Sequence, residues 1–267
     1  MTSNNADPSA GRTLEPLFAA REPDDLSSAA YRQLIGYLGL VLPFILCLVS
    51  GLRPTEGLPP WKVLESVSSY YYTGAVAAFV GVLVALGVFL VTYRGYKNEY
   101  RWRDRVAGVV AGIAAVLVAF FPTAVPIGLP ALFWWTKLTG AVHYIAAATL
   151  FCSFIFFSLF QFRKSKRGSG KTLPTSKRVR NGIHIFCGVA MAVCIAWVGI
   201  ASSMDAPIFW PEALALEFFA ASWLTKGHAD RTLIAAVRRA SYYGRHPRQL
   251  AGEVLGAISS LRNVSQL

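Results

Sequence analysis

The chain has 267 residues, of which 54% are hydrophobic and only 15% are charged, and its formal net charge is +12. A soluble globular domain carries about 25% charged residues, so this composition excludes an ordinary water-soluble protein. Lys and Arg beside membrane spans are attracted to anionic headgroups, which accounts for the positive charge. We expect no nucleic-acid partner, because the aromatic residues that would stack on bases lie in or beside the apolar segments.

The first 28 residues are polar and include Pro8, Pro16 and Pro23. They contain no basic segment followed by the apolar core of a signal peptide. We therefore expect residues 1–28 to form a disordered cytoplasmic arm that precedes the folded part of the chain.

Six apolar segments follow the arm, and most approach the roughly 20 residues that a helix needs to cross a bilayer. The predicted spans are residues 34–52, 75–93, 106–125, 138–160, 183–202 and 212–224, of which the last is the shortest. Residues 29–227 are thus predicted to be an all-α membrane domain, a bundle of six transmembrane helices.

The basic residues lie almost entirely on one side of these predicted spans. The segments before the first span, at 94–105, at 163–180 and after the sixth span hold 23 of the 26 Lys and Arg residues, whereas the opposite loops hold Arg53, Lys62 and Lys137. Cytoplasmic loops carry such an excess of Lys and Arg, so we place both termini in the cytoplasm. The absence of organelle signals and the abundance of Ala, Gly, Val and Arg favour a bacterial inner membrane.

Residues 228–267 are predicted to form a basic tail of two short amphipathic helices, which either lie on the membrane surface or pack on the bundle. Residues 168–172 read GSGKT but lack the earlier glycine of a phosphate-binding loop, because that position is Ser165. A basic loop without a nucleotide is the better interpretation, and we expect no cofactor.

Ionisable groups inside membrane spans are costly and point to functional sites. On the outer side, the candidates for a polar pocket are Ser66, Ser69, Tyr70, His143, Glu212 and Glu217, with Glu65 and Asp205 as second-rank candidates. We expect no metal there, since catalytic zinc sites usually take three protein ligands with histidine prominent and His143 is the only histidine on that side.

The inner side offers Asp104, His184 and Lys226. A local ion pair with the neighbouring arginines accounts for Asp104. His184, close to Arg180, has the position of an interfacial residue. These groups are therefore not expected to form a functional site.

Gly108 and Gly112 form a G-x-x-x-G pattern, which lets another helix approach closely. Packing inside the bundle is the first interpretation. Contact with a second copy of the chain, giving a homo-oligomer, is the alternative.

Four stretches carry a family resemblance: SVSSYYYTG before the second span, HYIAAATLFCSFIFFSLF in the fourth, RNGIHIFCG at the start of the fifth and EALALEFFAASWLT in the sixth. Over roughly residues 34–226 the chain resembles the DRAM/FRAG-type six-span membrane proteins. The resemblance implies a shared six-helix fold and involvement with lipids. It matches Val67, Ser68 and Ser69 to the family's ISD-like motif, with Ser69 in place of the acid, and it matches His143 and Glu212 to a histidine and a glutamate of the family.

Three functions follow from these expectations. The first is a non-enzymatic integral membrane protein that binds, senses or organises lipids through the outer polar pocket. The second is a membrane-embedded lipid hydrolase or acyl-remodelling enzyme, in which His143 is the base and a carboxylate orients it, with Ser66 or Ser69 available as the nucleophile. The third is a transporter or channel, although the spans lack a continuous row of polar residues.

Overall fold

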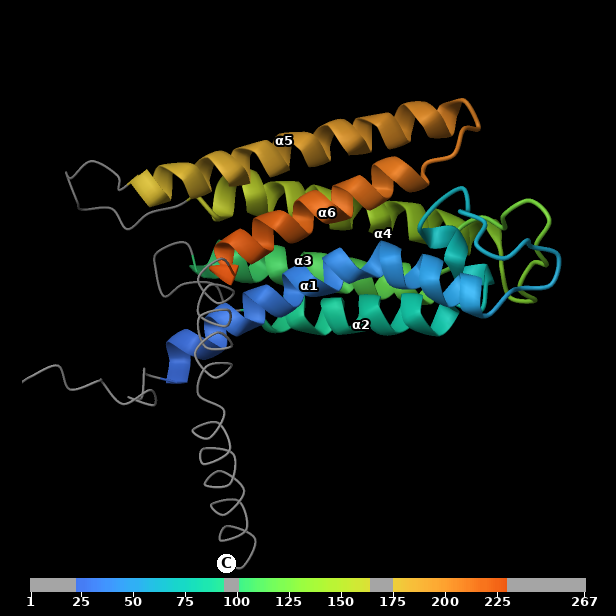
Figure 1. Cartoon of the computed structure of the whole chain (residues 1–267), viewed down its shortest axis with the longest axis horizontal. Helices are drawn as coiled ribbons and strands as arrows, with labels where there is room; N and C mark the ends of the chain where they lie inside the picture. Colours follow the sequence, from blue (N-terminus) through green and yellow to red (C-terminus); the bar gives the residue numbers. More distant parts are fainter. Residues whose placement is uncertain (1–22, 94–100, 164–174, 230–267) are drawn as a thin grey trace, which may run out of the picture.

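The computed structural model describes residues 23–93, 101–163 and 175–229 (Figure 1). These residues form six long α-helices and no strand, which confirms the all-α prediction for this part of the chain. The helices are α1 (Pro23–Leu52), α2 (Val76–Thr92), α3 (Arg101–Phe120), α4 (Lys137–Phe156), α5 (Thr175–Ser203) and α6 (Phe209–Lys226). Two short turns complete the fold, the 3-10 helix η1 (Ser68–Tyr72) and the π-helical turn η2 (Phe157–Gln161), which continues α4.

Several helix boundaries differ from the predicted ones; α5, for example, begins at Thr175, eight residues before the predicted span. α1 begins at Pro23, inside the predicted arm, since the fixed φ of proline suits a first helical turn. The rest of the arm lies outside the described residues, and so do the GSGKT loop and all of the tail except its first two residues. α3 ends at Phe120, five residues earlier than predicted. Pro122 explains this end, because proline disfavours helical geometry in the residue before it. α6 begins at Phe209, three residues before the predicted span.

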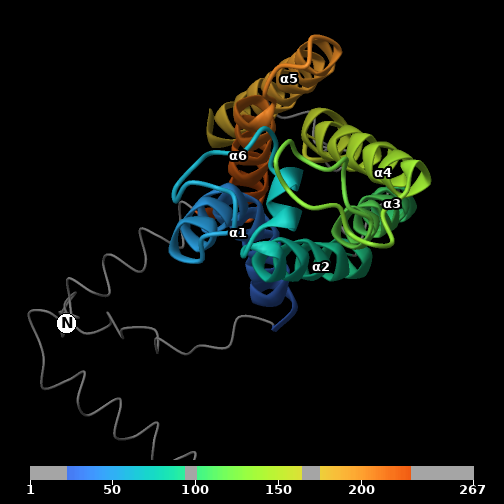
Figure 2. The same ribbon diagram turned by 90° about the vertical axis from the view of Figure 1, so that its right-hand side faces the viewer.

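Neighbouring helices in the sequence pack side by side, and α6 also packs on α1, which closes the bundle (Figure 2). Glycines on α1 allow this last contact. A Cβ atom on Gly39 would lie 2.6 Å from the ring of Phe219, and one on Gly36 would lie 2.7 Å from Leu224. Inside the bundle, the rings of Phe154 and Phe219 stack with their centroids 3.7 Å apart, which ties α4 to α6.

Three helices are long and apolar enough to cross a membrane, namely Ala29–Leu52, Lys137–Gln161 and Lys177–Ser203. α2 is also apolar but has only 17 residues. The bundle buries only 28–39% of the apolar windows of the three long helices. Large apolar side chains such as Phe44, Phe186 and Val193 are consequently 60–64% exposed.

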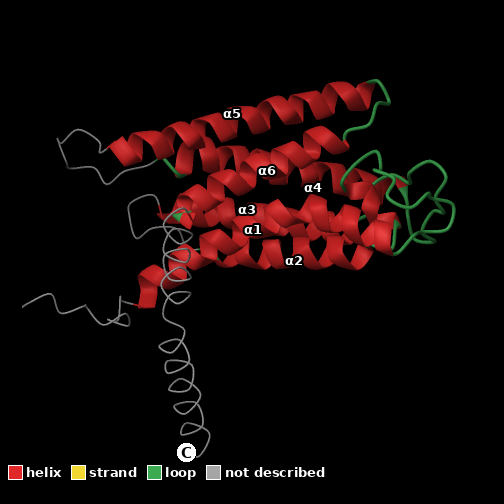
Figure 3. Ribbon diagram, viewed as in Figure 1, coloured by secondary structure: helices red, strands yellow, loops and turns green. Residues whose placement is uncertain are grey.

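The connections between α1 and α2, between α3 and α4, and between α5 and α6 gather at one end of the bundle (Figure 3). η1 lies at this end, near the centre of the ring of helices (Figure 2). This position brings the short segment before α2 close to helices that are distant in the sequence.

Candidate functional site

Five of the predicted outer residues meet at or beside η1. The segment folds as a tight turn because its own hydroxyls bond to its backbone. Ser66 Oγ accepts the Ser69 N–H at 3.0 Å, and Thr73 Oγ1 donates to the Tyr70 carbonyl at 2.8 Å. The hydroxyls of Ser66 and Ser69 also bond each other at 2.8 Å, so these two predicted site residues are paired within the segment.

His143, buried in α4, contacts η1 through a different serine. Its Nδ1 lies 2.6 Å from the carbonyl oxygen of Phe121, and its Nε2 lies 3.0 Å from Ser68 Oγ. A carbonyl oxygen only accepts hydrogen bonds, so Nδ1 carries the proton and the Ser68 hydroxyl donates to Nε2. The Phe121 carbonyl is available because α3 ends just before Pro122 and leaves its last carbonyls without helical partners.

Glu212, in the first turn of α6, also contacts this segment. Its Oε2 accepts the backbone N–H of Val67 at 2.8 Å. In the other direction, the carbonyl oxygen of Glu65 accepts the N–H groups of Ile208 and Phe209 at 2.6 and 2.8 Å, donors that a helix N-terminus leaves unpaired. Hydrogen bonds donated in both directions therefore hold the start of α6 against residues 65–67.

The tyrosines of η1 extend these contacts to α1 and to the α3–α4 connection. The hydroxyl of Tyr70 lies 3.2 Å from Cys47 Sγ, and burial together with this hydrogen bond raises the pKa of the Tyr70 phenol. The hydroxyl of Tyr72 donates to the Thr123 carbonyl at 2.7 Å, and burial raises the pKa of Tyr72 to about 12. Both phenols stay protonated near neutral pH.

We call Ser66, Ser68, Ser69, Tyr70, His143 and Glu212 the rim cluster. Five of its members were predicted from the sequence, whereas Ser68, which carries the contact to His143, was not among the candidates. Glu217, Asp205 and Glu65 take different positions: the carboxylate atom Oε1 of Glu217 is buried in α6 without a hydrogen-bond partner among the described residues, and the side chains of Asp205 and Glu65 are exposed.

At the opposite end of the bundle, His184 is buried and takes part in a hydrogen-bond network between helices. This side chain is only 2% exposed, and its Nδ1 lies 3.0 Å from Ser222 Oγ, which in turn accepts the Ser158 hydroxyl at 2.8 Å. Ser158 lies in η2, and the widened π-helical turn is a feature that often occurs at functional sites. In the sequence, the signal that could have indicated this network was the position of Ser158 and Ser222 within otherwise apolar predicted spans.

The described residues contain no group of three or more His, Cys, Asp and Glu side chains that could hold a metal ion. The rim cluster contributes one imidazole, one carboxylate and several hydroxyls, and Glu212 Oε2, Ser66 Oγ and His143 Nε2 accept hydrogen bonds within it. Its chemistry is that of hydrogen bonding and, through Ser68 and His143, of proton transfer from a hydroxyl to an imidazole.

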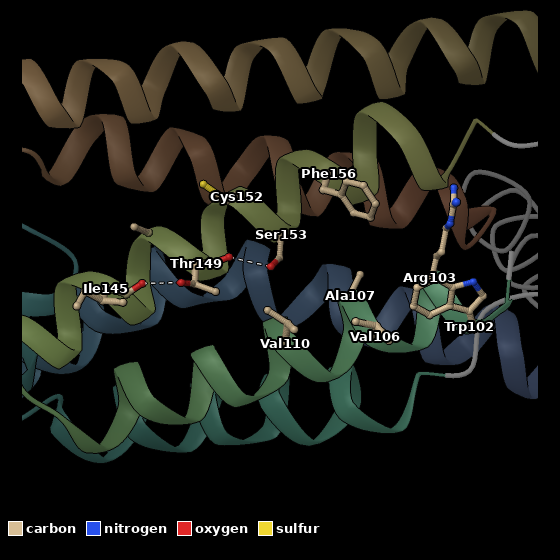
Figure 4. A pocket seen from close by; sticks show the side chains of 11 residues that line it. Trp102, Arg103, Val106, Ala107, Val110, Ile145, Thr149, Cys152, Ser153 and Phe156 are labelled. Atoms are coloured by element: carbon tan, nitrogen blue, oxygen red, sulfur yellow. Dashed lines mark hydrogen bonds between the residues drawn. The ribbon is translucent and has the colours of Figure 1, made fainter.

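A groove of about 660 Å³ lies elsewhere, along the outward face of α3 and α4 (Figure 4). Nothing in the sequence interpretation predicted it. Its wall is apolar: Val106, Ala107, Val110, Ile145, Ala148 and Phe156 line it together with Cys152, Thr149 and Ser153, and Trp102 and Arg103 stand at one end. The hydroxyls of Thr149 and Ser153 donate to carbonyls four residues earlier in α4, at 2.8 Å each.

The chain matches no family model, no curated protein and no solved structure. The resemblance to the DRAM/FRAG-type proteins therefore stays a prediction that rests on the four stretches of sequence.

Proposed function

We propose that the protein is an integral membrane protein of six transmembrane helices with both termini in the cytoplasm, and that it binds a membrane lipid along the groove between α3 and α4. The groove is the observation that carries this proposal. A volume of about 660 Å³ lies within the roughly 300–1,000 Å³ typical of ligand sites, and the wall offers apolar contact rather than hydrogen bonds.

The surface of the bundle supports the membrane part of the proposal. Monomeric soluble proteins rarely expose contiguous apolar patches of more than a few hundred Å², whereas here long apolar helices leave most of their surface unburied. Trp61 and Trp210 are 60% and 65% exposed near the loop-rich end, and Trp102 is 64% exposed near the other. Exposed tryptophans at two levels match the aromatic belts of membrane proteins.

The length of the groove supports a lipid chain as its occupant. The residues from Ile145 to Phe156 on α4 line it, and eleven residues of helix rise about 16 Å. This is close to half of the roughly 30 Å hydrocarbon core, which is the depth of one leaflet. Arg103, with Trp102, stands at the end where the basic segments lie, so a cation faces the level of the phosphates.

The test uses a phosphatidylcholine that carries a photoreactive acyl chain, reconstituted with the full chain in vesicles. Crosslinked peptides are expected to concentrate at residues 102–110 and 145–156. The substitution Ala148→Phe fills the groove and should reduce these crosslinks several-fold. Ala196→Phe is the matched control, because Ala196 is exposed on α5 and does not line the groove.

Any membrane protein touches lipid over its whole outer surface, and the control separates that contact from a site. Crosslinks spread evenly over the exposed faces of α1, α4 and α5, with the two phenylalanine variants indistinguishable, would contradict a lipid site in the groove. Recovery of the chain in the soluble fraction of expressing cells would contradict the membrane part.

A second candidate function rests on the contact between Ser68 and His143. A hydroxyl that donates to an imidazole, whose other nitrogen is held by a fixed acceptor, is the arrangement of a serine nucleophile and its base. The reaction would be acyl transfer from a lipid ester: the Ser68 oxygen attacks the carbonyl carbon, and His143 takes the proton and returns it to the leaving alcohol. We rank this second because neither residue lines the groove. Covalent labelling of Ser68 distinguishes the two functions.

A further inference from the structure

The connection between α3 and α4 is long and carries no charge. Residues 121–136 read FPTAVPIGLPALFWWT and contain no Asp, Glu, Lys, Arg or His. Loops of more than about 12–15 residues without secondary structure of their own are uncommon and are usually functional. The connection between α1 and α2, at the same end of the bundle (Figure 3), carries the exposed charges Arg53, Glu56 and Lys62. The two connections therefore suit different surroundings.

The large apolar side chains of this connection are exposed. Phe133 is fully exposed, Ile127 is 88% exposed, and Leu138, just after the connection, is 73% exposed. No other part of the described chain covers these side chains. Exposed apolar surface that gathers in one segment marks a contact with a protein or with a membrane. The connection thus has apolar surface for an occupant that the bundle does not supply.

The length of α3 indicates that this occupant is lipid. Arg105 is exposed near the inner end of α3, and the helix is apolar from Val106 to its end at Phe120. Residues 106–120 of a helix rise about 21 Å, whereas the hydrocarbon core is roughly 30 Å thick. The membrane orientation of the proposed function, on which this inference rests, puts roughly 9 Å of hydrocarbon beyond Phe120. The segment that follows Phe120 at this depth is the uncharged connection.

A locally thinner bilayer is another way to match a short helix, and the length of α4 argues against it. The apolar span Lys137–Gln161, which begins directly after the connection, has 25 residues. A helix of this length rises about 36 Å, which is enough for a bilayer of ordinary thickness. Thinning to the length of α3 would leave Phe133 and Leu138 in water.

The connection also has few polar groups that would have to enter lipid, where unpaired backbone groups are costly. Three of its residues are prolines, which have no N–H group. The Thr123 carbonyl accepts the Tyr72 hydroxyl at 2.7 Å and the Trp135 indole N–H at 2.9 Å. The backbone N–H groups of Leu129 and Trp135 donate to carbonyls three residues earlier, at 3.2 and 3.0 Å. These internal bonds lower the cost of an apolar surrounding.

We propose that residues 121–136 form a membrane-inserted connection, whose exposed apolar side chains contact acyl chains of the extracytoplasmic leaflet. Trp134 and Lys137 follow Phe133 and are exposed. Tryptophan is enriched at the level of the headgroups, and lysine keeps its ammonium group in water, so these two residues limit the depth of insertion. No residue of the connection lines the groove between α3 and α4, and the two lipid contacts are therefore separate.

The test places an environment-sensitive NBD label on single added cysteines in the full chain, reconstituted in right-side-out phosphatidylcholine vesicles. Cys152, the native cysteine whose side chain is exposed, is replaced by alanine, and this background without an added cysteine is the blank. Phe133→Cys is the test variant, because replacement of a fully exposed side chain removes little packing. A phosphatidylcholine with a doxyl group on its acyl chain quenches labels in lipid, and iodide quenches labels in water.

Glu56→Cys is the control for water and Val193→Cys the control for lipid, because Glu56 is exposed in the charged connection and Val193 is 60% exposed on α5. We expect the Phe133 label to behave like the Val193 label. The doxyl lipid should quench it several-fold more strongly than it quenches the Glu56 label, and iodide should show the reverse order. Ile127→Cys, at a second exposed position of the connection, should give the same result.

Iodide quenching of the Phe133 and Ile127 labels without lipid quenching overturns the proposal, because the connection then lies in water. Protection from both quenchers also overturns it, since a partner protein or a second copy of the chain then covers the connection. Either result together with lipid quenching of the Val193 label contradicts only the inserted connection. Absence of lipid quenching at Val193 contradicts the membrane part of the proposed function itself.

Discussion

At the scale of single residues, the hydrogen bond between Ser68 and His143 decides between two roles for the rim cluster. As a structural contact it joins η1 to α4, and the imidazole links both to the end of α3 through the Phe121 carbonyl. As a catalytic pair it would need Ser68 to meet a substrate. The two roles predict different behaviour toward a reagent that reacts with activated serines.

We expect a fluorophosphonate probe, applied to the protein in vesicles, to leave Ser68 unmodified, because the lipid groove lies away from this serine. Ser68→Ala should lower the free energy of unfolding by about 1 kcal/mol, the typical net contribution of one hydrogen bond. The measurements are mass mapping of the probe and thermal unfolding in detergent. Ser153→Ala is the control, since its hydroxyl bonds only to its own helix.

Reaction of Ser68 with the probe would contradict this expectation. A fluorophosphonate adduct on Ser68 that disappears in His143→Gln would establish the pair as nucleophile and base. The protein would then be an acyl-transfer enzyme, and lipid binding in the groove would have to be re-examined as substrate binding.

The serine that contacts His143 is Ser68 and neither of the predicted serines, Ser66 and Ser69. The sequence therefore predicted where the polar residues meet better than it predicted which residues take part. His143, Glu212 and the segment before the second span were all expected on the outer side, and their side chains or backbones do meet. The sequence could not specify the winding of the segment. In a 3-10 turn, residues three apart lie on the same side, so Ser66 and Ser69 face each other and Ser68 is left to face His143.

At the scale of helices, the backbones of α2 and α3 approach each other closely. A Cβ atom on Gly112 would lie 2.6 Å from the carbonyl oxygen of Gly87, and one on Gly108 would lie 2.7 Å from that of Leu90. The G-x-x-x-G pattern thus packs inside the bundle, which was its first interpretation. A contact of this pattern with a second copy of the chain stays a prediction.

Gly112→Ala should destabilise the protein by about 1–3 kcal/mol, the usual cost of overpacking, because the added methyl group meets backbone atoms that cannot rotate away. Gly81→Ala is the matched control on α2, where a Cβ atom meets nothing within 4 Å. That change should be neutral or stabilising, since alanine favours helix over glycine by about 1 kcal/mol. Thermal unfolding in detergent measures both; equal melting temperatures would contradict the close approach.

At the scale of the whole molecule, two sequence patterns have simple physical causes: the length of the apolar segments and the one-sided distribution of Lys and Arg. Apolar segments of nearly the right length predicted six helices, and six are present in the described residues. Composition could not specify the groove. It depends on which faces of α3 and α4 turn toward each other, and side-chain packing rather than hydropathy determines that rotation.

The asymmetry of basic residues makes a prediction about the molecule as a whole, namely that the loop-rich end faces away from the cytoplasm. Glu56 is exposed in the connection between α1 and α2, and Arg105 is exposed at the opposite end, in the first turns of α3. In right-side-out vesicles, a membrane-impermeant maleimide should label Glu56→Cys at once and Arg105→Cys only after permeabilisation. The wild-type chain, with its four native cysteines, is the blank. Labelling of Arg105→Cys in sealed vesicles would contradict the predicted orientation and would place the loop-rich end in the cytoplasm, against the excess of Lys and Arg at the other end.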